Sequence, residues 1–231
     1  METKKYRLTG NHINIGNRIL YQIEALKDFG NVKAGDLGGY IESEENLSQY
    51  DNAWVYGDAK VYGDAQVYGS AKVYDDAEVY GSAEVYGSAE VYDDAKVFDN
   101  AQVYDDAEVF DNAQVYDDAE VYGDAQVYGS AKVYDDAEVY GDAKVYDDAE
   151  IESTKDYIVF KNWWSSGRYF TWTRSNNMWK VGCFYGTGEE LIKKAYNDSK
   201  ESGREYERIV RYVESILADE KRKENEPIGI K

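Results

Sequence analysis

The sequence predicts a mainly β protein built around a β-solenoid, with an N-terminal β cap and a small C-terminal α+β domain. Three observations indicate this fold: a six-residue repeat from about Asn52 to Ile151, a hairpin pattern before it, and strand-like and helix-like patterns after it. They divide the chain into residues 1–50 (β-hairpin cap), 51–152 (acidic repeat), 156–220 (α+β domain with three strands and two helices) and 221–231 (charged tail).

The first segment is expected to close one end of the solenoid, because a repeat array needs its open end covered. Residues 13–26 alternate apolar and polar positions around Gly16-Asn17, which is typical of a hairpin with a two-residue turn. Ile41 and Leu47 are six residues apart and are expected to form the first rungs.

The repeat unit is Ala-x-Val-Tyr/Phe-(Gly/Asp)-(Asp/Ser/Asn), and 16 valines from Val55 to Val145 keep its register. Ala and Val are two residues apart, so an extended strand points both to the same side and points the aromatic residue to the other. Two turn-forming residues then bend the chain. Since such a short unit cannot bury its own apolar side, the units are expected to coil and stack.

The spacing of Val with a small residue two places earlier resembles the hexapeptide-repeat superfamily, whose members form left-handed parallel β-helices with three strands in each 18-residue turn. The resemblance covers residues 52–151 and implies a three-sided, left-handed β-helix. Tyr or Phe follows Val where many members have Gly. With 18 residues per turn, one outward ladder would consist of Tyr56, Tyr74, Tyr92, Phe110, Tyr128 and Tyr146. Such ladders either stiffen the solenoid or pack against a partner or a second copy, which leaves a homo-oligomer open.

Residues 20–48 and 179–191 resemble segments that flank hexapeptide repeats in phage- and prophage-encoded proteins. This resemblance implies a mobile-element origin. It also implies a small C-terminal domain to which no established activity is attached.

The C-terminal segment is expected to form three strands, at residues 157–164, 168–173 and 178–184, and two helices that begin at capping boxes Thr187/Glu190 and Ser202/Glu205. Cys183 has apolar neighbours and is expected to be buried. Aromatic and cationic residues alternate here, so they could contact nucleic acid or a partner, or could be core residues with solubilising charges beside them. These residues are Trp163, Trp164, Arg168, Arg174, Trp179 and Lys180.

The repeat carries all of the net charge. Ala53 to Glu150 contains 18 Asp and 7 Glu against 5 Lys, and the resulting −20 equals the charge of the whole chain. This balance disfavours direct binding to DNA or to anionic membranes and favours a basic protein partner. No signal peptide or stretch of about 20 apolar residues is found, so a cytoplasmic location is expected, in the host cell if the protein is phage-encoded.

The acid is concentrated at the corners between strands. Rungs about 4.8 Å apart would make a rod about 26 Å long, with one net charge per about 1.3 Å, close to the one per about 1.7 Å of duplex DNA. This density suggests a DNA-mimicking inhibitor of a host nucleic-acid-binding or defence protein; alternatively, Asp serves as a turn former and solubilises the repeat. The doubled corners, our predicted partner-binding residues, are Asp75, Asp76, Asp93, Asp94, Asp105, Asp106, Asp117, Asp118, Asp135, Asp136, Asp147 and Asp148.

The sequence predicts no catalytic residue, cofactor or metal site. It has no glycine-rich phosphate loop and no His/Cys cluster with zinc-ligand spacing, and its corners lack the Gly-Gly-x-Gly-x-Asp spacing of calcium-binding β-rolls. The superfamily resemblance would imply a histidine base for acyl transfer, but the single histidine, His12, precedes the repeat. We therefore expect a non-enzymatic interaction protein. The alternatives are a spacer or oligomerisation scaffold that presents the C-terminal domain and an acyltransferase relative.

Overall fold

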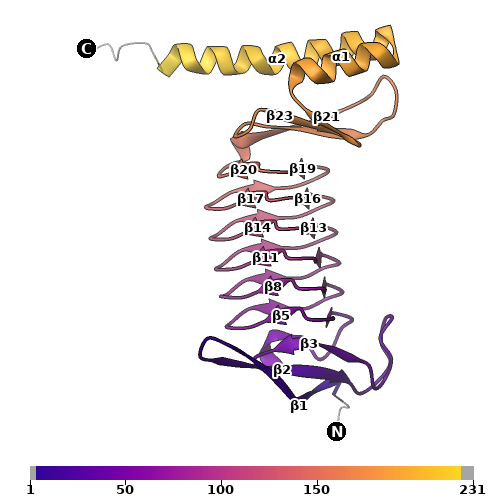
Figure 1. The fold of residues 1–231 in the computed structure, drawn as a ribbon, viewed down its shortest axis with the longest axis vertical. Helices are drawn as coiled ribbons and strands as arrows, with labels where there is room; N and C mark the ends of the chain where they lie inside the picture. Colours follow the sequence, from indigo (N-terminus) through magenta and orange to yellow (C-terminus); the bar gives the residue numbers. More distant parts are fainter. Residues whose placement is uncertain (1–3, 225–231) are drawn as a thin grey trace, which may run out of the picture.

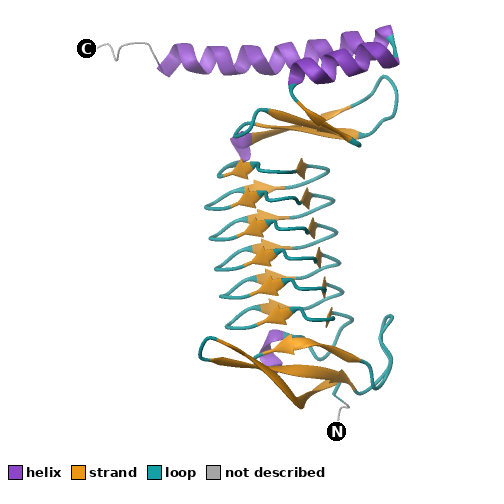
Figure 2. Cartoon of the chain, in the orientation of Figure 1, coloured by secondary structure: helices purple, strands orange, loops and turns teal. Residues whose placement is uncertain are grey.

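A computed structural model, which describes residues 4–224, shows a straight column of stacked short strands with a β-rich unit at the N-terminal end (Figure 1). A four-stranded sheet lies across the other end, and two helices cover its outer side (Figure 2). The predicted mainly β architecture is thus confirmed. In the described range, no helix is long and apolar enough to cross a membrane.

The N-terminal unit is an antiparallel arrangement of β1 (Tyr6–Ile15), β2 (Arg18–Ala25) and β3 (Leu37–Ile41). Gly16-Asn17 forms the predicted turn, since Ile15 pairs with Arg18 across it. β3 continues directly into the solenoid: Ile41 pairs with Val61, and Leu47 forms a bridge with Val67, as expected for the first rungs. Close packing requires glycine here, because a Cβ on Gly39 would lie 2.5 Å from the carbonyl oxygen of Ala59.

The coils of the solenoid have three flat faces, and each strand pairs in parallel with the strand 18 residues later, as Val73 does with Val91. Face 1 consists of β4 (Trp54–Val55), β7 (Lys72–Val73), β10 (Glu90–Val91), β13 (Glu108–Val109), β16 (Gln126–Val127) and β19 (Lys144–Val145). Face 2 continues β3 with β5 (Lys60–Val61), β8 (Glu78–Val79), β11 (Lys96–Val97), β14 (Gln114–Val115), β17 (Lys132–Val133) and β20 (Glu150–Ile151). Face 3 consists of β6 (Gln66–Val67), β9 (Glu84–Val85), β12 (Gln102–Val103), β15 (Glu120–Val121) and β18 (Glu138–Val139).

The interior of the column is built from the repeated Ala and Val side chains, all of which are at most 1% exposed between Ala53 and Ala149. The predicted inward pair is confirmed. At each corner the first turn residue is a Gly or an Asp with positive φ, such as Gly63 at 73° and Asp93 at 57°. Asp and Asn tolerate this left-handed conformation better than other side chains, which explains why acid collects at these positions.

The aromatic residues form three outward rows of stacked rings, which confirms the predicted ladders. Most rings on successive coils are close to parallel; Tyr86 and Tyr104, for example, have centroids 4.9 Å apart and an angle of 3° between their planes. The exceptions are the end pairs of the row on face 1, Tyr56–Tyr74 at 90° and Tyr128–Tyr146 at 40°. Row 1, on face 1, is the predicted ladder from Tyr56 to Tyr146 and contains Phe110. Row 2, on face 2, consists of Tyr62, Tyr80, Phe98, Tyr116 and Tyr134. Row 3, on face 3, consists of Tyr68, Tyr86, Tyr104, Tyr122 and Tyr140.

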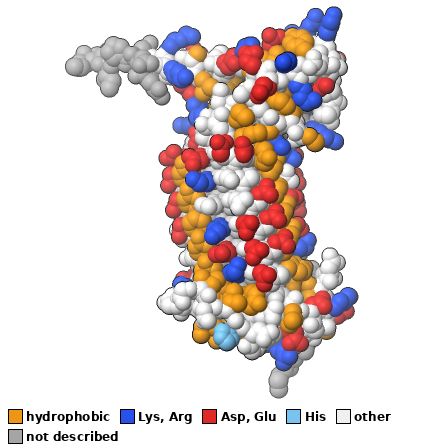
Figure 3. Space-filling model, in the orientation of Figure 1, with side chains coloured by type: hydrophobic (Ala, Val, Ile, Leu, Met, Phe, Trp, Pro, Cys, Tyr) orange, Lys and Arg blue, Asp and Glu red, His pale blue; other side chains and the backbone are white. Residues whose placement is uncertain are grey.

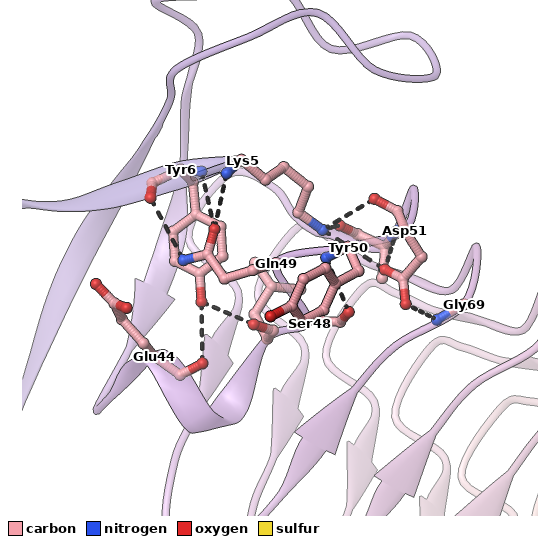
Figure 4. Close-up of polar contacts among 10 residues, drawn as sticks. Lys5, Tyr6, Glu44, Ser48, Gln49, Tyr50, Asp51 and Gly69 are labelled. Carbon is pink, nitrogen blue, oxygen red and sulfur yellow. Dashed lines mark hydrogen bonds and ion pairs between the residues drawn. The ribbon is translucent and has the colours of Figure 1, made fainter. Parts of the chain in front are cut away.

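A buried lysine lies at the N-terminal end of the column and binds backbone carbonyl oxygens there (Figure 4). The Lys5 side chain is fully buried, and its ammonium donates to the carbonyl oxygens of Asp51 (3.2 Å) and Ala53 (2.8 Å). The Asp51 carboxylate lies 3.6 Å away and in turn accepts from the backbone N–H of Gly69 at 2.7 Å. Burial lowers the pKa of Lys5 to about 8, although Asp51 opposes this shift.

The C-terminal domain contains β21 (Tyr157–Lys161), β22 (Tyr169–Thr173), β23 (Met178–Val181) and β24 (Phe184–Gly186), followed by α1 (Gly188–Asp198) and α2 (Lys200–Glu224). The predicted three strands are therefore wrong in number, because Gly182, with φ +55°, makes a tight turn inside the third predicted strand. Cys183 belongs to this turn and is exposed, which corrects the expectation that it is buried.

Of the two predicted helix starts, the first is confirmed and the second is wrong. The Thr187/Glu190 capping box is present at α1. The Ser202/Glu205 box is wrong: α2 begins at Lys200, and the hydroxyl of Ser199 accepts from the Ser202 N–H at 3.0 Å. The helix also continues to Glu224, so the predicted tail from residue 221 begins as helix, and its remainder lies outside the described residues.

Candidate functional site

The column has three edges, and the predicted acidic corners are distributed over all of them. We call each edge by the faces it joins. The edge between faces 1 and 2 carries Asp75, Asp76, Asp93, Asp94, Asp147 and Asp148; the edge between faces 2 and 3 carries Asp117, Asp118, Asp135 and Asp136; the edge between faces 3 and 1 carries Asp105 and Asp106. The structure therefore does not bring the twelve residues into one site.

The three faces differ in their outward charges. Faces 1 and 2 carry lysines that pair with glutamates on neighbouring coils, as in Lys72–Glu90 (2.6 Å) and Lys132–Glu150 (3.1 Å). Face 3 carries no lysine at its outward strand positions, which are Gln66, Glu84, Gln102, Glu120 and Glu138. Its negative charge is therefore not compensated within the repeat.

The glutamates of face 3 are held by tyrosine hydroxyls instead. Tyr104 donates to Glu120 at 2.8 Å, and Tyr122 donates to Glu138 at 3.0 Å. Burial raises the pKa of Tyr122 to about 12, and the hydrogen-bonded Glu138 carboxylate adds to the shift. Tyr122 therefore keeps its proton at physiological pH and donates it to the hydrogen bond with Glu138.

The edge between faces 2 and 3 has a hollow of about 650 Å³ near the C-terminal end of the column. Its lining consists of Asp117, Asp118, Asp135, Asp136, Glu152, Ser153 and Asp156. Asp156 has a structural role: it accepts from the Ser153 N–H at 2.8 Å and lies 3.7 Å from the Arg174 guanidinium. In the described structure, the repeat's salt bridges lie on faces 1 and 2, so the four corner aspartates of the hollow have no cationic partner.

Figure 3 shows one side of the molecule, with many Asp and Glu side chains along the column, a few Lys or Arg among them, and positive and negative side chains mixed at both ends. Within residues 4–224, no group of three or more His, Cys, Asp or Glu side chains is arranged to hold a metal ion.

The six residues singled out in the C-terminal domain do not form one surface. Trp179 is a core residue, 2% exposed, and Trp164 packs its ring against Tyr206. Arg174 pairs with Glu220 at 2.6 Å. The remaining three are Lys180, whose ammonium lies 4.3 Å from the centre of the Tyr146 ring, and the exposed Trp163 and Arg168.

His12, the residue relevant to acyl transfer, lies on β1 and is exposed. β1 lies at the N-terminal end of the column (Figure 1), whereas the acidic hollow is lined by residues of the later coils and of the segment that follows them. The His12 ring is 6.1 Å from the ring of Tyr21, its neighbour across the hairpin. Sequence reasoning missed Lys5 because nothing in the local pattern distinguishes it from the neighbouring exposed lysine, Lys4.

The repeat is similar to a known protein family. A family model described as the YdcK β-solenoid repeat matches residues 113–129, which contain β14, β15 and β16. A search of curated proteins gives no match. Together with the parallel coils seen in the structure, the family match identifies the chain as a β-helix repeat protein.

Proposed function

We propose that this chain is a non-enzymatic interaction protein of phage or prophage origin, and a divergent relative of the hexapeptide-repeat superfamily, that binds a basic protein surface in place of DNA. The observation that carries this proposal is the acidic hollow on the edge between faces 2 and 3, whose corner aspartates have no cationic partner among the described residues. The proposed partner is a nucleic-acid-binding or defence protein of the host cytoplasm.

Electrostatics favours face 3 and its two edges as the binding surface. Together they hold ten aspartates and three glutamates of the repeat and no lysine. A surface of one charge sign attracts an oppositely charged partner during encounter and repels nucleic acid. Proteins that bind DNA neutralise rows of phosphates with Lys and Arg, and a row of carboxylates offers them a similar target.

The tyrosines of row 3 would make this face bind arginine side chains more tightly than lysine side chains. An arginine guanidinium can stack on an aromatic ring while it pairs with a carboxylate, and both groups are adjacent on this face. Tyr68, Tyr104 and Tyr122 donate to glutamates, the first to Glu84 at 2.7 Å, so these three rings lie beside a negative charge. We therefore expect arginine-rich surfaces to bind more tightly than lysine-rich ones.

A charge-matched pair of variants tests the location of the site. The site variant is D117N/D118N/D135N/D136N, and the control is D75N/D76N/D93N/D94N, which removes the same charge from the edge between faces 1 and 2. Asn accepts the left-handed conformation of the corners, so the turns should persist. With an arginine-rich peptide as probe, the site variant should bind about tenfold more weakly or worse, and the control should lose less.

Two measurements can contradict the proposal: the dependence of binding on salt and the loss of affinity in each of the two variants. Binding of the probe should weaken steeply as salt is raised, because exposed charge pairs are screened. An equal loss in both variants would show that total charge and not the hollow matters. Binding that is indifferent to salt would overturn the electrostatic mechanism.

A scaffold that presents the C-terminal domain is the second candidate function. It is favoured by the separate hydrophobic core of that domain and by Trp163, which is 72% exposed. In that case capture of a host protein from lysate should be lost with Trp163→Ala and unaffected by the four Asp→Asn changes. The opposite pattern would support the acidic site.

A further inference from the structure

Row 3, the unbroken row of tyrosines on face 3, has the geometry of a one-electron relay. We propose that it transfers oxidising equivalents along the column, by electron hopping between neighbouring rings, when a one-electron oxidant reaches one end. This activity does not depend on the proposed binding function.

The first requirement is contact between oxidisable rings. Centroid separations along the row are 4.9, 4.9, 4.9 and 5.3 Å, and the planes of successive rings are within 15° of parallel. Stacked rings at this separation are in direct contact, so an electron can pass from one to the next without a bridging group. Rows 1 and 2 contain Phe110 and Phe98, which lack the hydroxyl that makes tyrosine oxidisable.

The second requirement is a place for the proton, because an oxidised phenol becomes strongly acidic. The hydroxyls of Tyr68, Tyr104 and Tyr122 donate to glutamates 16 residues later, at 2.7, 2.8 and 3.0 Å. Tyr86 donates to the amide oxygen of Gln102 at 3.1 Å, which is a poor base. Oxidation of Tyr86 is therefore expected to be the slowest step of electron transfer along the row.

The hopping step balances in electrons and protons. Loss of one electron from Tyr104 is accompanied by transfer of its phenolic proton to Glu120, which leaves a neutral tyrosyl radical and a neutral carboxylic acid. That radical takes an electron from Tyr122, whose proton passes to Glu138, while Glu120 returns its proton to Tyr104. The radical has then moved by one coil, and nothing else has changed.

The row ends at a ring that solvent can reach. Tyr140 is 46% exposed, and beyond it Tyr157 is buried and meets it edge-on at 6.4 Å. When Tyr140 gives an electron to Tyr122, its proton therefore passes to solvent, and Glu138 returns its proton to Tyr122. The Tyr140 radical can then take one electron and one proton from a one-electron reductant in solution, which restores the phenol. The row would thus move oxidation from the coils to one exposed position.

Site-directed photo-oxidation of the full chain tests this relay. A ruthenium polypyridyl photosensitiser is attached through Ser70→Cys, at the exposed corner next to Tyr68, in a chain that also carries Cys183→Ser to remove the exposed natural thiol. Light and persulfate produce the oxidised ruthenium centre, which takes one electron from the row. Spin-trap adducts are then located by mass spectrometry, and we expect them at Tyr140.

Two further variants decide the route. Tyr104→Phe should abolish the adduct at Tyr140, because it inserts into row 3 the break that Phe98 makes in row 2; phenylalanine already occupies stacked positions in the solenoid, so the fold should tolerate it. Tyr116→Phe, a matched change in row 2, should leave the adduct unchanged. An adduct at Tyr140 that persists in Tyr104→Phe, or that is absent from the parent chain, would overturn the relay.

Discussion

The two ends of the solenoid are closed in different ways. At the N-terminal end, Tyr6, Ile23 and Ile41 belong to the same continuous apolar core as the repeated Ala and Val side chains, and β3 extends face 2. At the C-terminal end, Tyr157 and Val159 of β21 reach that core, whereas Phe170 and Trp172 belong to a separate core shared with α1 and α2. One end is therefore part of the solenoid, whereas the other is a distinct unit placed on it.

The contacts at the C-terminal seam are mainly polar groups and ring edges. The hydroxyl of Thr171 accepts from the Lys144 N–H at 2.8 Å, and the Tyr185 ring meets the Tyr146 ring edge-on at 4.8 Å. Asn176 donates to Asp148 at 2.9 Å. Such contacts orient the domain on the last coil but bury less apolar surface than a shared core would, so the two parts should unfold separately.

The largest test of this difference is removal of a core ring from the C-terminal domain. Phe170 is fully buried, and Phe170→Ala should lower the free energy of unfolding of that domain by about 4 kcal/mol. Hydrogen exchange followed by mass spectrometry should show faster exchange in residues 157–220, with unchanged protection in face 3. Loss of protection along the entire column would show that the two cores are coupled.

The next test concerns the buried lysine of the N-terminal end. Because burial lowers the pKa of Lys5 from 10.5 to about 8, the unfolded chain binds its proton more tightly than the folded chain does. The cost of the buried charge is present below pH 8 and disappears as the pH rises toward 10.5, so this group makes stability rise with pH across that window. The change is on the order of 3 kcal/mol for a shift of this size.

Lys5→Met isolates this contribution. Chemical denaturation of parent and variant between pH 8 and 10 should show that the stability of the parent rises relative to that of Lys5→Met. The tyrosines, whose pKa values are raised in the folded chain, make the stability of both chains fall as the pH approaches 10, so the difference between the two chains reports Lys5. Parallel pH profiles in the two chains would contradict a depressed pKa at Lys5.

The contrast between the ends also explains how far the sequence could predict the fold. In the repeat, period and polarity agree at every unit, so the inward Ala-Val pairs followed from the spacing, and the stacked rows followed from the 18-residue turn that the hexapeptide-repeat resemblance implies. Lys5 and Cys183 were different, since the burial of each depends on one tertiary contact or one tight turn. The hollow itself depends on which corners share an edge and on Glu152 and Asp156, which lie beyond the last regular unit.

The smallest effect is expected at the seam. Thr171→Val keeps the shape of a fully buried side chain but removes the acceptor for the Lys144 N–H, so the attachment of the domain to the last coil should weaken by about 1 kcal/mol. The Lys144 amide should exchange faster while the domain core stays protected. Thr173→Val is the matched control, because the Thr173 hydroxyl bonds to Asn176 within the domain and not to the solenoid. If the Lys144 amide exchanged equally fast in both variants, its protection would come from the stability of the domain and not from the seam.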